Sequence, residues 1–406
     1  SGFLGTVSKA SIAGSGWGLT GNAGTTAGTN FFGTTDNQDG VFKANNTEQF
    51  RMLSSGGISI PNSTGNSIGV IFKGSDRFIH NFQLTGTATT LGQNLFIGLK
   101  AGNFTMTGSS GGFGTRNLSI GDSTLYANTT GYRNVAIGVW NATNNTTGFE
   151  NTTVGANAFQ TNTTGRQNTA IGAISLENNT TGFRNTAVGF SSMQYSTTAE
   201  RNVAIGGRAM QNVTTGFANA ALGFDALAYN STADHNVAVG LDALYYSNGS
   251  HNTAVGDSTL WGLFNGPGQL HVGYKNVAIG SRAGYHLGDT YNNYASIFDT
   301  AVTFLGANAS RDSSIPYTTS LQNMTVIGYN ARGFASNQVV LGNDDVTTTL
   351  LKGKVGIGTT TPTSKLHISE SGVSGSVTTS YIESIGATTT NRTLRLKAAN
   401  AVNNIA

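Results

Sequence analysis

The chain contains no cysteine, only 4 prolines and few charged residues, and each shortage excludes a class of protein. Without cysteine there are neither disulfides nor thiolate metal ligands. Asp, Glu, Lys and Arg make up 10 % of the 406 residues, well below the roughly 25 % of typical globular domains. The net charge is only +3, and the scattered basic residues give no indication of nucleic-acid binding. No apolar run approaches the ~18 residues needed to cross a bilayer, so we expect no membrane insertion by this segment.

Glycine, in contrast, is abundant at 56 residues and marks an internal repeat. One phrase reads Asn134-Val-Ala-Ile-Gly138 and returns as Asn168-Thr-Ala-Ile-Gly172 and Asn202-Val-Ala-Ile-Gly206. From Gly121 to Gly240 the closing glycines are 17 residues apart. Self-similarity at a fixed period is the signature of stacked repeats, so the repeat predicts the architecture better than single-residue propensities do.

Each unit also contains a small residue followed by a large apolar one, as in Ala226-Leu227, and a turn phrase such as Asn145–Gly148. We therefore expect one unit to be strand, corner, short strand and corner, which together form one coil of a β-solenoid. Successive coils would lie ~4.8 Å apart, the spacing of paired strands. Within the strand, Val135 and Ile137 point one way and Ala136 the other. We expect the first pair to face into the coil and the Ala/Gly face to form a smooth outer wall that packs against a neighbouring chain.

A single coil buries little apolar surface, so stacking and oligomerisation must offset an ordering cost of roughly 1–2 kcal/mol per residue. The asparagine that opens each phrase recurs at the same place in successive coils. We expect these side-chain amides to form a structural ladder that satisfies polar groups at the corner. The column consists of Asn134, Asn151, Asn168, Asn185, Asn202, Asn219, Asn236, Asn252 and Asn276.

The repeated Asn-x-Ala-[Val/Ile]-Gly phrase resembles the head repeat of the YadA-like trimeric autotransporter adhesins, and the match covers residues 94–345. The resemblance implies a left-handed parallel β-roll in which three chains pack around one axis. One departure is that the usual head unit is shorter than the 17 residues found here. Further on, Val355–Pro362 followed by Lys365–Ile368 resembles the segment that precedes the intramolecular chaperone of phage tail fibres.

These observations predict an all-β fold, a trimeric left-handed parallel β-roll (β-solenoid) fibre with β-rich N- and C-terminal regions. Residues 1–90 are expected to form a β-rich stalk. Residues 91–345 are expected to form the repeat domain, with regular coils over 121–256 and loop-bearing coils over 257–345. Residues 346–406 are expected to form a C-terminal β region that precedes a missing chaperone or anchor.

After Gly256 the period breaks, and the surplus residues are expected to leave the roll as loops at 263–272, 285–300 and 310–322. Polar loops rich in Tyr and Asn on a rigid scaffold are typical of binding surfaces. The candidate receptor-binding residues are Phe264, His271, Tyr285, His286, Tyr291, Tyr294, Phe298 and Tyr317.

No catalytic site is predicted, because the acidic residues of the repeat occupy different columns and no nucleophile, histidine and acid group together. We expect no cofactor and no metal site. His235 and His251 lie one coil apart in one column, which is more often a solvated edge than a metal site. Paired threonines such as Thr146-Thr147 stack in register, which favours a hydrogen-bonded corner over an ice-binding array. The aromatic column that includes Phe149 favours a corner cover or subunit seam over a glycan contact.

The sequence therefore favours a homotrimeric extracellular fibre or adhesin that attaches to a surface glycan or protein. Such a fibre would belong to a bacterial cell surface, a phage or an injection particle. Two alternatives stay open: a passive structural spacer of a fibre, and an ice-binding β-solenoid.

Overall fold

The computed structural model describes residues 36–63, 69–82, 93–107, 113–261, 273–285, 299–316 and 319–368. The chain divides into two compact units, residues 1–344 and 345–406. All regular elements of the described residues are β-strands, and no helix occurs among them, as the all-β prediction required.

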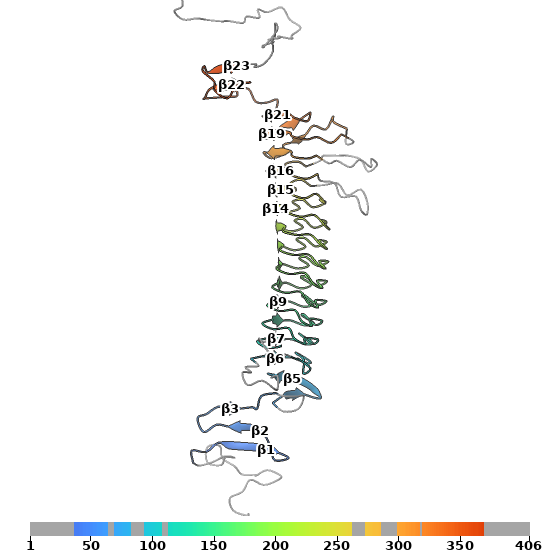
Figure 1. Cartoon of the computed structure of the whole chain (residues 1–406), viewed down its shortest axis with the longest axis vertical. Helices are drawn as coiled ribbons and strands as arrows, with labels where there is room; N and C mark the ends of the chain where they lie inside the picture. Colours follow the sequence, from blue (N-terminus) through green and yellow to red (C-terminus); the bar gives the residue numbers. More distant parts are fainter. Residues whose placement is uncertain are drawn as a thin grey trace, which may run out of the picture. The chain divides into compact units, whose positions relative to one another are not determined.

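A 16-stranded sheet dominates the first unit (Figure 1). It begins with the antiparallel hairpin of β4 (Ile71–Lys73) and β5 (Asp76–His80), and β5 then pairs antiparallel with β6 (Leu95–Ile97). From β6 onward every neighbour in this sheet pairs in parallel, as the register of β6 and β7 illustrates with Phe96 opposite Ser119. The remaining strands, in sheet order, are β7 (Leu118–Ile120), β8 (Val135–Ile137), β9 (Thr152–Val154), β10 (Thr169–Ile171), β11 (Thr186–Val188), β12 (Val203–Ile205), β13 (Ala220–Leu222), β14 (Val237–Val239), β15 (Thr253–Val255), β16 (Val277–Ile279), β17 (Thr303–Leu305), β19 (Thr325–Ile327) and β21 (Val339–Leu341).

Three smaller sheets complete the described structure. In the first unit, β1 (Gly40–Ala44), β2 (Thr47–Met52) and β3 (Ile58–Ser59) form an antiparallel sheet. In the same unit, β18 (Ser310–Arg311) and β20 (Arg332–Gly333) pair in parallel. In the second unit, β22 (Val355–Ile357) pairs in parallel with β23 (Leu366–Ile368).

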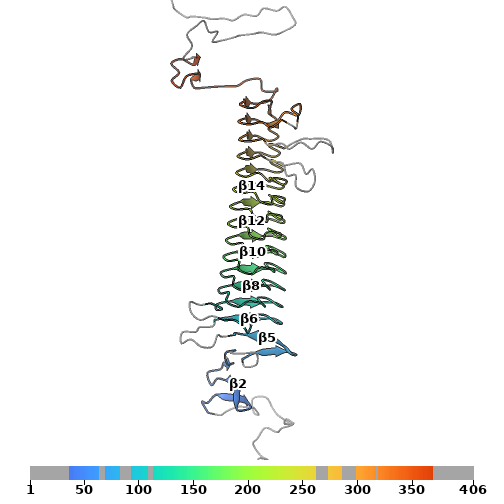
Figure 2. The same ribbon diagram turned by 45° about the vertical axis from the view of Figure 1, so that its right-hand side comes forward.

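The parallel strands belong to stacked coils, one strand to each coil, which is the β-solenoid that the repeat predicts (Figure 2). Like residues lie in register, so that Ala170 pairs with Ala187 and Ala187 with Ala204. The second short strand expected in each unit does not form in the regular coils. Its residues form turns instead, because Met193 adopts a left-handed backbone with φ of 49°. The Met193 amide still donates to the Ala209 carbonyl of the next coil at 3.0 Å, so the stack remains hydrogen-bonded there.

The interior of the coils is lined by alanine, so the sequence-based assignment of the two strand faces is wrong. Ala170 and Ala204 have no exposed surface, whereas Ile171 and Ile205 are each 40 % exposed. The coil is a thin loop, and the large residue of the opposite turn, such as Leu176, already fills its inner space. The strand therefore contributes only its small residue to the core, and alternation turns Val and Ile outward.

Near both ends of the stack the core column holds phenylalanine in place of alanine. Phe96 in β6 and Phe304 in β17 are both buried. Each is accommodated by a glycine in the turn, because a Cβ on Gly102 would lie 2.5 Å from the Phe96 ring and one on Gly284 would lie 3.1 Å from the Phe304 ring. In these two coils the strand holds the large residue and the turn the small one, which reverses the arrangement of the regular coils.

The glycine that closes each strand is required by both backbone angle and space. Gly172 has φ of +133°, and a Cβ there would lie 2.4 Å from the carbonyl oxygen of Gly189 in the next coil. L-residues rarely adopt this φ, and no real Cβ approaches a carbonyl oxygen that closely. The glycine therefore recurs once in every coil because its backbone contacts the backbone of the next coil at this point.

The asparagine column runs through the buried interior as a chain of hydrogen bonds. Asn168 donates from its backbone amide to Oδ1 of Asn151 at 3.0 Å, and its Nδ2 donates to the Gly182 carbonyl at 2.9 Å. Asn185 repeats this pattern toward Asn168. A second, shorter ladder joins the asparagines of the turn phrase, which are Asn128, Asn145, Asn162 and Asn179.

Candidate functional site

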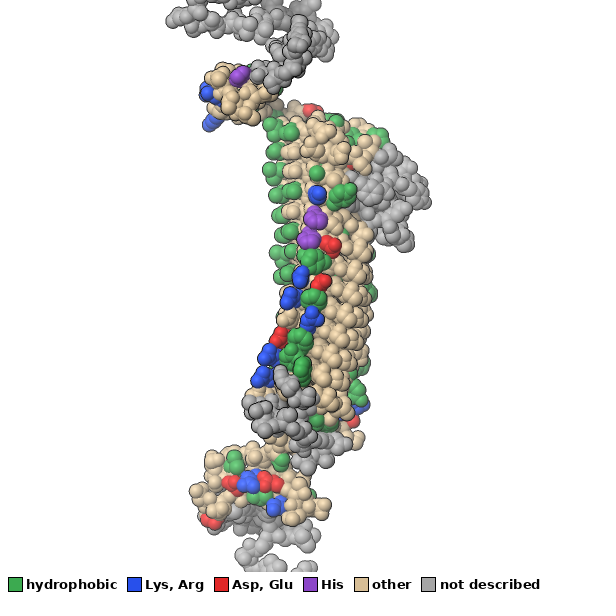
Figure 3. Space-filling view, in the orientation of Figure 1, with side chains coloured by type: hydrophobic (Ala, Val, Ile, Leu, Met, Phe, Trp, Pro, Cys, Tyr) green, Lys and Arg blue, Asp and Glu red, His purple; other side chains and the backbone are tan. Residues whose placement is uncertain are grey.

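The outward side chains of the parallel strands form a continuous apolar face, visible as a green column along the stack in Figure 3. Each strand contributes its first and third residues to this face. Between β6 and β21 these two columns contain only Val, Ile, Leu, Thr and Ala, and no charged residue. The large members exposed by 36 % or more are Leu95, Ile120, Ile171, Val203, Ile205, Leu222, Val237, Ile279, Leu305, Val339 and Leu341.

A mixed aromatic and charged stripe follows the corner after the Thr-Thr-Gly turn, where Figure 3 shows blue, red and purple side chains. The rings of Tyr132 and Phe149 stack at 4.8 Å, and the Arg166 guanidinium lies 4.5 Å from the centre of the Phe183 ring. Hydrogen bonds from Arg133 and Gln167 lower the pKa of the Glu150 carboxyl. Neighbouring coils and arginine side chains thus cover much of each ring.

The two histidines of this stripe lie in the same column. The rings of His235 and His251 stack with centroids 4.9 Å apart, and His235 also meets the edge of Phe217. Within the described ranges, no three His, Cys, Asp or Glu side chains are grouped so that they could hold a metal ion. The histidine pair is therefore a stacking contact between coils.

Most of the predicted receptor-binding residues lie outside the described residues, namely Phe264, His271, His286, Tyr291, Tyr294, Phe298 and Tyr317. Tyr285 is described and is half-buried at the end of its coil, against Trp261 at 5.3 Å. The loop-contact assignments at the other positions stay predictions.

The segment 310–322 was expected to leave the roll, but its described part is held on the stack. Ser310 and Arg311 form β18, and the buried Arg311 guanidinium pairs with Asp299 at 3.2 Å. Arg311 also donates to the carbonyls of Pro316 and Thr319. Burial raises the pKa of the Asp299 carboxyl despite this pairing. The described residues of this segment therefore enclose the Arg311–Asp299 ion pair. The composition of the segment did not predict this ion pair.

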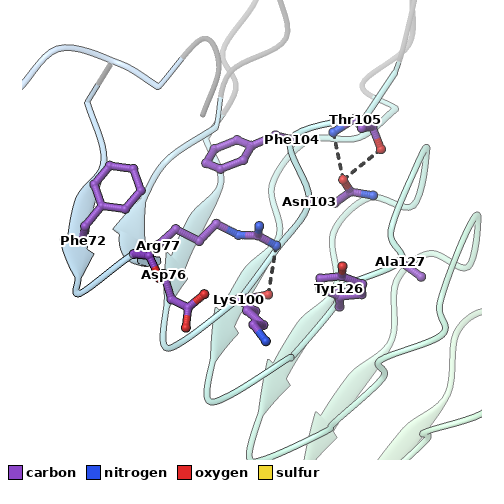
Figure 4. Close-up of a pocket in the computed structure, with 10 residues that line it drawn as sticks. Phe72, Asp76, Arg77, Lys100, Asn103, Phe104, Thr105, Tyr126 and Ala127 are labelled. Atoms are coloured by element: carbon purple, nitrogen blue, oxygen red, sulfur yellow. Dashed lines mark hydrogen bonds between the residues drawn. The ribbon is translucent and has the colours of Figure 1, made fainter. Parts of the chain in front are cut away.

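A cavity of about 580 Å³ lies where the β4–β5 hairpin meets the first coils (Figure 4). Arg77 donates to the carbonyls of Ala101, Lys100 and Gly102, so its guanidinium caps the open end of the first coil. Burial lowers the pKa of Arg77. The other lining residues are Phe72, Ser75, Asp76, Asn103, Phe104, Thr105, Tyr126 and Ala127.

A cluster of five aromatic side chains, which we call the aromatic ladder, lies on the coils where the period breaks. Of these five residues, only Tyr285 was predicted from the sequence to bind a receptor. Alignment of the coils could have indicated the others, because a column that holds glutamate or glutamine in earlier coils holds aromatic residues here. The ladder consists of Tyr229, Tyr245, Tyr246, Trp261 and Tyr285.

Comparison of the chain with protein-family models, with curated proteins and with solved structures finds no match. Within the described residues, no helix is long and apolar enough to span a membrane. The surfaces of the stack are therefore the evidence that bears on function.

Proposed function

We propose that this chain is one subunit of an extracellular homotrimeric attachment fibre. Three copies would pack through the apolar face of a left-handed β-roll, and the loop-bearing coils would bind a surface glycan or protein. The apolar face is the observation that carries the proposal. At ~4.8 Å per strand it extends about 60 Å along the stack and about 10 Å across each three-residue strand. An area of about 600 Å² reaches the upper limit of exposed apolar patches on ordinary monomers.

A second copy of the same chain is the partner that fits this face. The face repeats once per coil, and two such faces placed side by side match along their whole length. It also carries no charge that a partner would have to neutralise. In a trimer each copy divides its face of about 600 Å² between two neighbours, so residues beside the face must also be buried to reach the roughly 800 Å² per partner of stable interfaces. The number three comes from the resemblance of the repeat to the YadA-like heads.

Sedimentation equilibrium of the purified chain tests the assembly. We expect a mass three times the 42.0 kDa of one chain. Val203→Asp with Ile205→Asp should dissociate the trimer, because the two carboxylates would be desolvated in the centre of the interface. Tyr195→Asp is the matched control, because Tyr195 is 46 % exposed but lies outside the apolar face. A wild-type chain that stays folded and monomeric at micromolar concentration would refute the trimer.

The attachment role is tested separately from the assembly. Scrambling residues 263–272 and 286–298, which spares Tyr285 and the buried Asp299, should weaken binding of the labelled fibre to its target surface while leaving the trimer mass unchanged. Multivalency would make this loss large, since three weak contacts act together. If binding is unchanged with both loops scrambled, the loops are not the contact site, whereas a wild-type fibre that binds no target surface favours the alternative of a passive spacer.

The ice-binding alternative has less support from the threonine pairs. The first threonine of a pair donates its hydroxyl to a carbonyl of the next coil, as Thr163 does to Thr180 at 3.0 Å and Thr180 to Thr197 at 3.0 Å. These hydroxyls hold the corner together, as the corner-ladder interpretation expected. Only the second threonine of each pair, such as Thr164, remains exposed. A single column of threonines is a narrow surface for binding ice.

A further inference from the structure

We propose that the aromatic ladder binds a neutral polysaccharide. The proposal rests on the attachment function proposed above and names both a ligand class and a site on the coils themselves. The site is formed by Tyr229, Tyr245, Tyr246, Trp261 and Tyr285, together with the carboxylate of Asp242.

The aromatic residues are not needed to build a coil, which is the first argument. Tyr245 and Trp261 directly follow the large buried residues Leu244 and Leu260, and Tyr285 occupies the same place in its coil after Gly284. In earlier coils the same position holds a hydrogen-bonded polar row, in which Gln194 donates to Glu177 at 2.8 Å and Gln211 to Gln194 at 3.1 Å. The next column changes in the same coils, because Tyr229 and Tyr246 replace residues such as Asn178 and Asn212, and Tyr195 is the one tyrosine of this column in an earlier coil. Coils with polar residues at these positions form the same hydrogen bonds between coils, so the change to aromatic residues calls for another explanation.

Three of the rings are spaced one per coil, at distances close to the repeat of a sugar chain. The rings of Tyr245 and Trp261 are nearly parallel at 7°, with centroids 6.4 Å apart, and Trp261 and Tyr285 follow at 5.3 Å and 28°. Each step is close to the length of one pyranose unit. All five side chains are half-buried, so the rings are held by one another and still reach the surface. Rigid, amphipathic rings of this kind provide contact area at a low cost in conformational entropy.

Hydrogen-bonding groups for sugar hydroxyls lie beside the rings. Asp225 is buried and paired with Arg208, whereas no described residue donates a hydrogen bond to the side chain of Asp242. Burial is the main cause that raises the pKa of the Tyr246 hydroxyl, and the negative charges of Asp242 and Asp225 act in the same direction. A carboxylate next to a ring can accept hydrogen bonds from hydroxyls while the ring contacts the apolar face of the sugar.

Carboxylates outnumber guanidinium groups at the site, which favours neutral over acidic glycans. Asp242 lies within electrostatic reach of Asp225 and Asp257, and of these three only Asp225 has a salt-bridge partner, Arg208. The second guanidinium is that of Arg282, 5.8 Å from the centre of the Tyr285 ring. An acidic polysaccharide would place further negative charge next to these carboxylates, which costs binding energy. A neutral hexose polymer meets the rings and carboxylates without this penalty.

The test is a binding assay of the full-length fibre on an array of neutral hexose oligomers, namely β-glucans and mannans, with polygalacturonate as the acidic counterpart. We expect binding to neutral oligomers, and about tenfold weaker binding for the double variant Tyr245→Gln with Trp261→Gln. Both substitutions introduce the residue that earlier coils carry at this position. Tyr126→Gln is the matched control, because Tyr126 is exposed in the same column but lies outside the ladder.

The mass of every variant is measured in parallel, so that a failure of the glycan site is distinct from a failure of the trimer. If the double variant does not fold, Tyr285→Gln alone and a titration of Trp261 fluorescence against the Trp261→Tyr variant replace it. A trimer that binds no neutral oligomer overturns the proposal and leaves the fibre standing. Equal binding by wild-type and ladder variants, or loss of binding in Tyr126→Gln instead, also overturns it.

Discussion

At the scale of single residues, the stack depends on positions that are repeated rather than on a few large side chains. The closing glycine permits contact between successive backbones, and the buried asparagine column supplies hydrogen bonds to backbone groups inside the coils. Asn168, for example, is almost fully buried and accepts hydrogen bonds from both Nδ2 and the backbone amide of Asn185. A buried polar ladder of this kind is stabilising only when each member is satisfied.

The substitution Asn168→Ala tests this dependence. It leaves the Asn185 backbone amide without its acceptor, while the Gly182 carbonyl keeps one donor, Asn179 Nδ2 at 3.3 Å. Because a buried group left unsatisfied costs about 1–3 kcal/mol, we expect the free energy of unfolding to fall by roughly 1–3 kcal/mol. Chemical denaturation monitored by circular dichroism measures this change.

The neighbouring substitution Gln167→Ala is the control for Asn168→Ala. Gln167 is exposed on the outside of the same coil, so its loss should change the free energy of unfolding by less than about 0.5 kcal/mol. Equal effects of the two substitutions would contradict a structural role for the ladder.

At the scale of elements, the β4–β5 hairpin closes the first end of the parallel stack around a buried histidine. His80 is 3 % exposed and lies between the rings of Phe96 and Phe104, at 4.8 and 4.5 Å. Its Nε2 donates to the Ala101 carbonyl at 2.8 Å, and its Nδ1 accepts from the Phe82 amide. This arrangement fits the neutral ring, because a protonated Nδ1 has no lone pair to accept with.

The hairpin should therefore loosen on acidification. Burial lowers the pKa of His80 from its usual 6.5 to about 4. Between these values the unfolded chain binds a proton that the folded chain excludes, so stability is full above pH 6.5 and falls as the pH decreases toward 4. The total loss is roughly 3 kcal/mol. Hydrogen exchange of the Gly98 amide, which donates to the Phe78 carbonyl of β5, should be faster at pH 5 than at pH 7 after correction for intrinsic rates.

The variant His80→Phe provides the control for this pH effect. A phenyl ring keeps the contacts with Phe96 and Phe104 but cannot titrate, so the difference between the two pH values should disappear at Gly98. Amides of the central coils, such as Gly189, should show no such difference in either protein. A persistent pH effect in His80→Phe would assign it to another group.

The elements also show what the sequence could and could not predict. The period placed each parallel strand correctly, because the Gly172 and Asn168 columns have backbone reasons to recur. The prediction of which strand face points into the coil was wrong. The alternation of side chains along a strand defines two faces but does not determine which one is buried. That choice depends on the width of the coil, which Leu176 and its equivalents already fill. The packing around Arg311 was missed because its partner Asp299 is distant in sequence.

At the scale of the whole molecule, stability should be close to a sum over coils and the contacts between neighbouring coils. The regular coils share register, glycine contacts and both asparagine ladders, so each is nearly interchangeable with the next. The apolar face and the aromatic ladder lie on this uniform scaffold at different corners of the coil. Length can then vary without altering either surface.

Removal of one complete coil tests this additivity. Deleting residues 173–189 joins Gly172 to Phe190, which occupies the same place after its glycine as Ala173 does. Every column then stays in register, and the stack should shorten by ~4.8 Å. We expect a folded protein with the same oligomeric mass and a thermal midpoint only a few degrees lower, measured by circular dichroism and sedimentation. Deleting only residues 173–180 is the comparison, because it moves the large turn residues out of their column and removes Asn179 from the second asparagine ladder. This half-coil deletion should abolish cooperative unfolding. If the two deletions damage the fold equally, the coils are not independent units and stability is set by the stack as a whole.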